Sequence, residues 1–435
     1  MAKSPSRLAL AFAALQYSAY RRFAISLLFT ALGVQLLQTA ILWQVYELTG
    51  SALALGLTGL ARAGPHIILS MVGGVLADRV NRVRLIQSGQ VVNAVLVSGL
   101  AGLTLAGAVE VWHLYAVTVF NGGFTALTQP GRTAVIPSLI PREKLVNAIA
   151  LNATIGQTSQ IAGPAFAGLA IGFLGLGTVY LVNGLFYFLA MIALVAVHVP
   201  PLVTQAKVSP WRSFLDGLIF VRQKPIILSL LTLDVAATVL GSYRALLPIF
   251  AANLGVGAGG YGLLSASPGV GSLFGSGFML SLGDMKYKGL YALTAVFGYC
   301  GALVLLALSP WFVLALLAAG LLGVTDSVQM IARNSTIIAI APDALRGRVE
   351  AFRTMLSGGG PPLGYTLSGG LAAVLGAPLA VVIGAAACAA VVAGIGGSRK
   401  ELRDPYLGTS SDPAVVGDDA GPRRSGDGYG DRPKP

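Results

Sequence analysis

Twelve long apolar stretches run along the chain, separated by short segments that hold most of its charged residues. A transmembrane helix needs about 20 apolar residues to cross about 30 Å of hydrocarbon, and each stretch is close to that length. Because a chain inside a bilayer must satisfy its backbone hydrogen bonds internally, the pattern predicts an all-α membrane protein. The expected spans are residues 23–46, 54–76, 85–106, 112–131, 148–171, 178–199, 226–251, 260–282, 289–308, 311–331, 350–374 and 378–397.

The basic residues between these stretches lie on one side of the predicted membrane. Of the 29 Lys and Arg residues, Arg62 and Arg244 fall well within expected spans and Arg353 near the start of one, and the others lie at the termini or in every second loop. Cytoplasmic loops are rich in Lys and Arg, so we expect both termini in the cytoplasm, the N-terminus uncleaved. The intervening loops without Lys or Arg are 47–53, 107–112, 172–177, 252–259, 309–310 and 375–377.

The longest internal loop divides the expected spans into two sets of six. Its Trp211 to Val221 stretch carries apolar residues mostly on one helical face, which predicts an interfacial amphipathic helix, with a soluble linker helix as the alternative. The polar tail is poor in large apolar residues and should be disordered. The expected organisation is a cytoplasmic N-terminus at 1–22, a six-helix bundle at 23–199, the linker at 200–225, a second six-helix bundle at 226–397 and the tail at 398–435.

The two halves also resemble each other in sequence. Four positions of the first half recur in the second, two of them 201 and two of them 206 residues later. The matched pairs are Arg132 with Arg333, Gly163 with Gly364, Gly56 with Gly262 and Asp78 with Asp284. We expect Arg132 and Arg333 in the loops that follow the fourth span of each half. Repeated halves typify secondary transporters, whose substrate site lies between the repeats near the bilayer midplane.

Composition agrees with a membrane protein and excludes several other classes. The mean hydropathy is +0.76, and 11% of residues are charged, against about 25% in soluble domains. The net charge of +12 is spread over alternating loops, so it indicates anionic lipid headgroups rather than nucleic acid. Cys300 and Cys388 lie inside apolar runs without metal-ligand spacing, so we expect no metal and no disulfide.

The segment from Gly73 to Arg84 carries the most specific motif. Its glycines allow close helix packing, and Asp78 with its neighbouring arginines could form a cytoplasmic charge network or cap a helix N-terminus. The segment resembles the motif Gly-x-x-x-Asp-Arg/Lys-x-Gly-Arg/Lys-Arg/Lys of the major facilitator superfamily, with Asn81 in place of the second glycine. The residues assigned to this gating loop are Gly74, Asp78, Arg79, Arg82, Arg84 and Arg132. The alternative is that the arginines only fix the topology.

Two further segments resemble one branch of that superfamily. Residues 43–51 and 132–152 are similar to the branch that contains enterobactin exporters and macrolide or multidrug efflux pumps. The resemblance implies the major facilitator fold, alternating access and proton-coupled export of a small molecule, with the proton gradient as energy source and no cofactor. Gly163, Pro164 and Gly168 resemble the Gly-Pro motif of antiporters, in which proline bends the helix and small residues permit close packing.

Charged residues within the expected spans are candidates for proton coupling. A charge at the centre of a spanning helix costs about 2.5–3.5 kcal/mol on insertion scales, so it usually faces a cavity or a partner. Low-dielectric surroundings favour the protonated form of a carboxyl group, which suits a proton carrier. We expect Asp234 to carry the coupling proton, with Asp326 second, and Arg62 or Arg244 to pair with an acid or an anionic substrate. The alternative is that these residues form ion pairs that only lock the bundles together.

Uncharged polar residues in the spans could line a substrate cavity. His66 lies one turn after Arg62 and could titrate near neutral pH, although a hydrogen-bonded packing role beside Pro65 explains it better. The remaining cavity candidates are Gln35, Gln38, Asn93, Asn121, Asn152 and Gln157. Any of them could instead join helices by hydrogen bonds.

The sequence therefore favours a monomeric, multi-pass secondary transporter of the plasma membrane, as found in a bacterial inner membrane, with a small-molecule substrate, protons and lipid as its partners. An ATP-driven pump is disfavoured, because no phosphate-binding Gly-x-x-x-x-Gly-Lys-Ser/Thr loop is present. An importer or a lipid flippase of the same superfamily is the nearest alternative. An intramembrane enzyme is more remote, since it would leave the repeat and the Asp78 loop unexplained.

Overall fold

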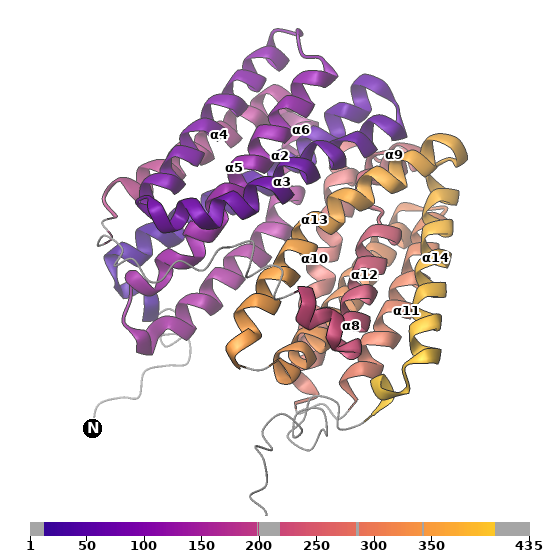
Figure 1. The fold of residues 1–435 in the computed structure, drawn as a ribbon. Helices are drawn as coiled ribbons and strands as arrows, with labels where there is room; N and C mark the ends of the chain where they lie inside the picture. The colour runs from indigo at the N-terminus through magenta and orange to yellow at the C-terminus, as the bar shows by residue number, and fades with distance from the viewer. Residues whose placement is uncertain (1–12, 198, 200–217, 284–286, 342, 405–435) are drawn as a thin grey trace, which may run out of the picture.

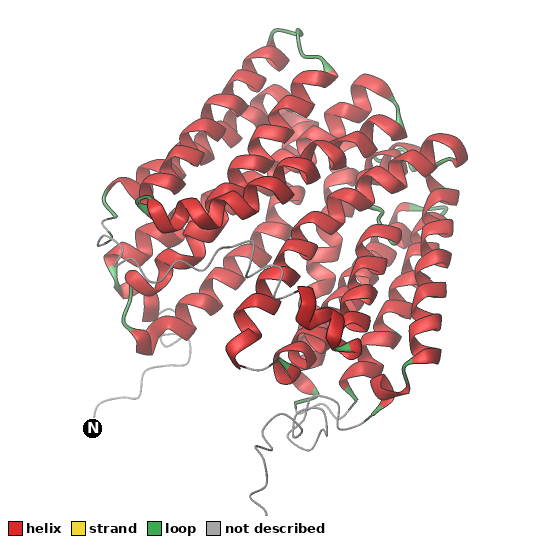
Figure 2. Cartoon of the chain, in the orientation of Figure 1, coloured by secondary structure: helices red, strands yellow, loops and turns green. Residues whose placement is uncertain are grey.

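The computed structural model describes residues 13–197, 199, 218–283, 287–341 and 343–404, and in these residues the chain forms helices and no strand (Figure 2). Nine segments of this described part are long and apolar enough to cross a membrane. One of them, Arg142–Val195, comprises two helices joined at Gly175, whose φ of 77° and ψ of 164° are not helical. The multi-span membrane architecture is thus confirmed, whereas the count of twelve spans and the side of the termini stay predictions.

Five α-helices build the part of the chain before residue 200, here called the N-terminal half (Figure 1). Each coincides with one expected apolar stretch, except α6, which contains two. The polar residues between stretches form short turns. The helices are α2 (Ser18–Thr49), α3 (Ala52–Arg79), α4 (Arg82–Leu105), α5 (Val111–Val135) and α6 (Leu145–Val195), with 3₁₀ turns η1 (Ala13–Gln16), η2 (Ile136–Ser138) and η3 (Arg142–Lys144).

The described residues from 218 onward, here called the C-terminal half, repeat this pattern with one broken span. The elements are α8 (Pro225–Val235), η4 (Ala236–Leu240), η5 (Arg244–Leu246), α9 (Leu247–Asn253), α10 (Gly257–Ser281), α11 (Lys288–Ala307), α12 (Phe312–Ile340), α13 (Asp343–Leu375), α14 (Ala377–Ser398) and η6 (Lys400–Arg403).

The expected seventh span, residues 226–251, is not one continuous helix. A π-helical turn at η4 is followed by a break at residues 241–243, after which η5 and α9 complete the segment. The Tyr299 hydroxyl donates a 3.1 Å hydrogen bond to the Gly241 carbonyl, which has no helical partner at the break. Such side-chain bonds make broken helices tolerable inside a membrane. The break places Arg244 in a 3₁₀ turn rather than in the outer part of a helix.

Two arginines assigned to loops lie in helices instead. Arg132 belongs to the last turn of α5, and Arg333 lies within α12, which continues to Ile340. Hydropathy alone ended these spans too early, because a helix can include a charged residue wherever that residue finds a partner. The prediction that Arg132 and Arg333 lie in loops was therefore wrong.

The two halves meet at two glycine–glycine crossings. A Cβ placed on Gly168 of α6 would lie 2.5 Å from the Cα of Gly262 in α10, and one placed on Gly56 of α3 would lie 2.9 Å from the Cα of Gly369 in α13. Figure 1 shows α3 and α13 running side by side between the halves. Such small-residue contacts let helices approach closely. Both crossings lie near helix ends next to loops without Lys or Arg, so the halves are in contact at the predicted outer end.

Some predictions fall outside the described residues. These are most of the amphipathic helix expected at 211–221, the acidic position Asp284, and the tail from 405 onward. The chain after Ser398 does not become irregular at once, because η6 follows α14 and the fully buried Leu402 packs against Gly289. Packed structure in this region therefore continues past residue 398, the expected start of the tail.

Candidate functional site: a cavity between the two halves

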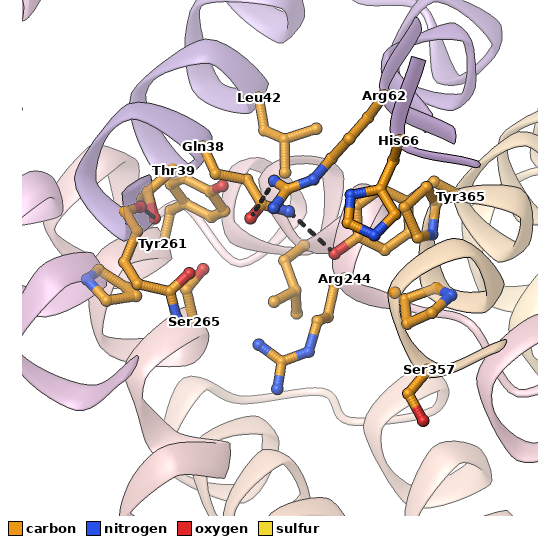
Figure 3. Close-up of a pocket in the computed structure, with 16 residues that line it drawn as sticks. Gln38, Thr39, Leu42, Arg62, His66, Arg244, Tyr261, Ser265, Ser357 and Tyr365 are labelled. Atoms are coloured by element: carbon orange, nitrogen blue, oxygen red, sulfur yellow. Dashed lines mark hydrogen bonds between the residues drawn. The ribbon is translucent and has the colours of Figure 1, made fainter. Parts of the chain in front are cut away.

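A cavity of about 280 Å³ lies between the N-terminal and C-terminal halves (Figure 3). Helices α2, α3 and α6 supply one part of its wall, and η5, α9, α10 and α13 supply the other. The lining residues are Gln35, Gln38, Thr39, Leu42, Arg62, His66, Pro164, Arg244, Leu247, Tyr261, Ser265, Ser357, Gly358, Pro361, Pro362 and Tyr365. The cavity thus gathers Gln35, Gln38, Arg62, His66 and Arg244, which were expected to face a substrate or a partner.

Arg62 is held in the cavity by a hydrogen-bond chain that crosses between the halves. Its guanidinium donates a 2.7 Å hydrogen bond to the Gln38 side-chain oxygen, and the Gln38 amide donates a 3.2 Å bond to the Tyr365 hydroxyl (Figure 3). Gln38 lies on α2 and Tyr365 on α13, so this chain ties the halves together at the cavity. Within the described residues the structure gives Arg62 no carboxylate partner.

Arg244 reaches the cavity from the C-terminal half, directly after the broken span. Its guanidinium carbon lies 5.8 Å from the centre of the Tyr243 ring, within cation–π range. It also interacts electrostatically with Asp326. Arg244 lies in η5, directly after the break, and its side chain lines the cavity (Figure 3).

His66 both lines the cavity and packs between helices. Its Nε2 lies so close to Gly358 of α13 that any side chain at that position would collide with it. The packing role that the sequence suggested is therefore present, and the ring also faces the space beside Arg62 (Figure 3).

The acid expected to carry the proton, Asp234, forms a buried ion pair with Arg333. The two side chains are 7% and 4% exposed, so both charges are almost fully removed from solvent. The partner of Asp234 is therefore Arg333 of α12, a residue that was not among the expected partners, and the pairing of Arg62 or Arg244 with an acid or an anionic substrate stays a prediction. The match of Arg333 with Arg132 in the repeat was the signal that could have identified it.

Asp326 lies in the same region of the C-terminal half but in a different environment. It is exposed, and it interacts electrostatically with Arg244, Asp234 and Arg333. Neither acid is among the residues that line the cavity. The structure therefore places two candidate acids and two arginines in one electrostatic group, in which only Arg244 reaches the cavity wall.

Asn93 and Asn121, two of the remaining polar candidates, join helices instead of lining the main cavity. The Asn121 amide donates hydrogen bonds of 3.0 Å to Asn93 and 2.9 Å to the Tyr187 hydroxyl, which link α5, α4 and α6. Asn121 also borders a separate cavity of about 30 Å³ that shares Gln38 and Arg62 with the main one.

Asn152 and Gln157 on α6 likewise bind neighbouring helices. Asn152 accepts a 3.0 Å hydrogen bond from the Tyr20 hydroxyl of α2. The Gln157 amide donates to Ser272 and, at 3.3 Å, to the Gly269 carbonyl, both on α10 of the other half. Gln157 therefore ties the two halves together beyond the wall of the main cavity.

The expected gating loop is a tight turn between α3 and α4. Asn81, at the position where the superfamily motif has glycine, caps α4 by accepting bonds from the backbone amides of Val83 and Arg84. The cap is thus Asn81 rather than Asp78, which lies in the last turn of α3 with its side chain outside the described part of the structure.

The arginines of this turn lie in different environments. Arg82 donates a 2.8 Å hydrogen bond to the Ala134 carbonyl at the end of α5, close to the last turn that holds Arg132. Arg79 and Arg84 are exposed. Gly74 has room for a side chain, whereas its neighbour Gly73 packs against the backbone of Leu127. The close approach at this turn is therefore made by Gly73.

The glycines near Pro164 serve close packing. A Cβ on Gly163 would lie 2.6 Å from the Cβ of Gln35 on α2, and Gly168 forms one of the two crossings between the halves. Pro164 lines the cavity. Helix α6 runs through Pro164 in helical conformation, and its non-helical residue is Gly175.

Several aromatic and hydroxyl residues of the cavity were not foreseen from the sequence. Tyr261 stacks on Trp43 at 5.4 Å between ring centres, and Tyr365, Ser265 and Ser357 complete the C-terminal wall. Each lies in an apolar run where an aromatic or small residue carries no distinguishing pattern. Only the packing of the two halves brings these side chains to one place.

Comparison with known proteins agrees with this architecture. Residues 9–405 match the model of the transmembrane secretion effector family. The chain belongs to this family of the major facilitator superfamily. It is accordingly a membrane transporter and not an enzyme.

The enterobactin exporter EntS resembles this chain in sequence over most of its length. The chain is 25% identical to the enterobactin exporter EntS of Shigella boydii serotype 18 over 359 residues, 82% of this chain and 86% of that one. EntS of Escherichia coli O81 matches over the same share at the same identity.

Solved structures share the fold at low sequence identity. The nucleoside transporter NupG superposes with a TM-score of 0.69 at 14% identity, covering 88% of this chain and 99% of that one. An inward-facing, occupied bacterial homologue of the human lysosomal transporter Spinster gives a TM-score of 0.65 at 16% identity, covering 89% and 96%.

Proposed function

We propose that the protein exports a small molecule in exchange for protons, by alternating access of the cavity between its halves. Two features of the structure together support the proposal. One is a cavity walled by both halves and lined by Arg62 and Arg244. The other is the buried Asp234–Arg333 ion pair. The similarity to enterobactin exporters supports export as the direction.

The crossings at Gly56 and Gly168 support a rocking motion of the halves. They bring the halves together at the predicted outer end, which is one of the two arrangements that alternating access requires. In this proposal, the crossings separate when the substrate leaves, and the Asp78–Arg84 turn closes the opposite end.

Asp234 carries the coupling proton in this mechanism. When its carboxylate is ionised, it pairs with Arg333, and when it is protonated, the attraction is lost and α8 and α12 are freed to shift. A buried pair is a suitable switch, because removing one of its charges changes the energy far more than it would at a surface. In this proposal Asp326 receives the proton next, and its interaction with the same arginine, Arg333, supports that order.

The proposal is tested by the accumulation of a panel of siderophores, macrolides and dyes in cells with and without the protein. We expect at least one compound to accumulate less in expressing cells, and an uncoupler to abolish the difference. Higher accumulation in expressing cells would show import, and a difference that persists with the uncoupler would remove the proton from the mechanism. A change in the distribution of labelled lipid between leaflets, without effect on the panel, would favour the flippase.

The role of Asp234 is tested in the same cells with Asp234→Asn. Because this variant leaves Arg333 buried without its partner, export is compared at equal amounts of inserted protein, and we expect uncoupler-sensitive export to be lost. The exposed Glu401, changed to Gln, is the matched control and should export like the unmodified protein. Intact proton-driven export by Asp234→Asn would show that its carboxylate serves only to hold helices together.

A further inference from the structure

The wall of the cavity between the halves carries positive charge and, among its described residues, no negative charge. Arg62 and Arg244 line it, and the lining residues in the described part of the chain include no Asp or Glu. Charged residues within a membrane protein usually face a partner of opposite charge. Here the wall of the cavity supplies the two cations but not their counter-charge.

The contacts of Arg62 leave most of its guanidinium available. Its hydrogen bond goes to the Gln38 amide oxygen, which is neutral. A guanidinium has five N–H donors in a fixed planar arrangement, and this bond positions the group without neutralising it. Because Gln38 is itself held by Tyr365, the orientation of Arg62 is set before any ligand binds.

The carboxylate that interacts with the charge of Arg244 lies outside the cavity wall. Asp326 interacts with Arg244 electrostatically, but the same carboxylate also interacts with Arg333 and lies outside the cavity wall. The Tyr243 ring contributes a cation–π contact at 5.8 Å. On the cavity side, Arg244 thus faces the same space as Arg62 without a described carboxylate between them.

We propose that the substrate is a compact organic anion whose carboxylate, sulfonate or phosphate group binds Arg62 and Arg244. This inference rests on the proposed function and specifies the substrate class of that site. Arginine binds planar oxyanions through paired hydrogen bonds. Tyr261, whose ring stacks on Trp43 behind it, offers with Leu247 and Pro361 an apolar surface for the body of such a molecule.

The volume of the cavity supports a compact ligand. At about 280 Å³, it lies just below the about 300–1,000 Å³ that small-molecule sites usually span. A macrolide with its sugars is therefore a poorer fit than a single-ring or two-ring acid. An anion bound to one arginine from each half would also link α3 to η5 and so favour the arrangement in which the halves are in contact.

The test uses calorimetric titration of the purified full-length protein with three probes of the same shape. These are naphthoate, which is anionic, naphthamide, which is neutral, and naphthylmethylammonium, which is cationic. We expect naphthoate to bind at least about tenfold more tightly than naphthamide, the difference typical of one or two charge-assisted hydrogen bonds. The ammonium should bind least.

Arginine variants then locate the anion. Arg62→Gln and Arg244→Gln should each weaken naphthoate binding by about tenfold or more and leave naphthamide binding unchanged, whereas Arg→Lys at either position should retain part of the preference. The exposed Arg222, changed to Gln, is the control and should bind all three probes like the unmodified protein. The naphthamide titration also shows whether each variant keeps an intact cavity.

The proposal is overturned if naphthamide binds as tightly as naphthoate, if the ammonium binds best, or if naphthoate does not bind at millimolar concentration. It is also overturned if neither glutamine variant changes the preference for the anion. Titration involves no proton gradient, so these outcomes are separate from the direction and coupling of transport. A protein that binds naphthoate but exports nothing would contradict the proposed function and leave the substrate class in place.

Discussion

Replacing Arg333 by Gln should strongly destabilise the protein, because it would leave Asp234 buried without a partner. The two side chains are 4% and 7% exposed, so solvent cannot take over the role of the lost charge. Breaking a buried ion pair by removing one partner typically costs about 3–5 kcal/mol, whereas an exposed pair contributes about 0–1 kcal/mol. We therefore expect Arg333→Gln to lower the free energy of unfolding by about 3–5 kcal/mol.

The double variant Asp234→Asn with Arg333→Gln should recover most of that loss, because it removes the unpaired charge. Reversible unfolding of the purified protein in mixed micelles, followed by tryptophan fluorescence, gives the free energies of the four proteins in the cycle. Replacement of Glu350 by Gln, which removes a 52% exposed carboxylate that pairs with Arg353 on the same helix, is the matched control. Its cost should stay within about 1 kcal/mol.

The same cycle separates a structural role from a coupling role. If Asp234 carries the proton, the double variant should be stable but unable to couple transport to protons. An Arg333→Gln variant as stable as the Glu350→Gln control would refute the reasoning, since the Asp234–Arg333 pair would then not be desolvated. Recovery of proton-driven transport in the double variant would show that the pair is only a link between α8 and α12.

Three further predictions concern contacts between and within the halves. Gly168→Val should reduce transport about fivefold or more, because its side chain would collide with Gly262 at a cost of about 1–3 kcal/mol. Gly172→Val has open space and should transport normally in the same vesicle assay. Asn81→Ala should lower the unfolding free energy by about 0.5–2 kcal/mol, because the side-chain cap of α4 is lost. Asn81→Ser keeps a capping oxygen and should not lower it. Equal stability of the two variants would contradict the capping role. Gln157→Leu should cost about 0.5–1.5 kcal/mol of unfolding free energy by removing bonds between the halves, and an unchanged value would show that these bonds are replaced by water.

The helices could be predicted from the sequence because membrane spans are encoded locally. Each needs only a run of apolar residues of sufficient length, and every expected run coincides with described helical structure. The exception, the seventh span, depends on a tertiary contact, the bond from Tyr299 to the Gly241 carbonyl. No local sequence pattern predicts this hydrogen bond, because Tyr299 lies 58 residues after Gly241.

The site was only partly predictable for a related reason. Arg62 and Arg244 could be identified because a charge in an apolar run is conspicuous, and both line the cavity. Arg333 was misplaced because hydropathy ends a span at a charge, although burial against Asp234 lets the helix continue. Tyr261 and Trp43 could not be found at all, because aromatic residues are common in spans and their stacking exists only after α2 and α10 come together.

The repeat between the halves proved more informative than its individual matches suggested. The offsets of 201 and 206 residues, which relate Arg132 to Arg333 and Gly56 to Gly262, also relate the partners at the two crossings. Gly168 and Gly369 differ by the first offset, so the crossing of α6 with α10 is the counterpart of that of α3 with α13. The contacts between the halves are therefore themselves duplicated, as a symmetric rocking motion requires.

The most direct test of the account is transport by the purified protein in vesicles with an imposed proton gradient. With an acidic lumen, we predict that a substrate from the cellular panel accumulates inside while protons leave, that an uncoupler stops this accumulation, and that Asp234→Asn abolishes it. Accumulation driven by an acidic exterior, with protons and substrate moving together, would contradict exchange. Full gradient-driven accumulation by Asp234→Asn would contradict the assignment of the proton to the buried pair.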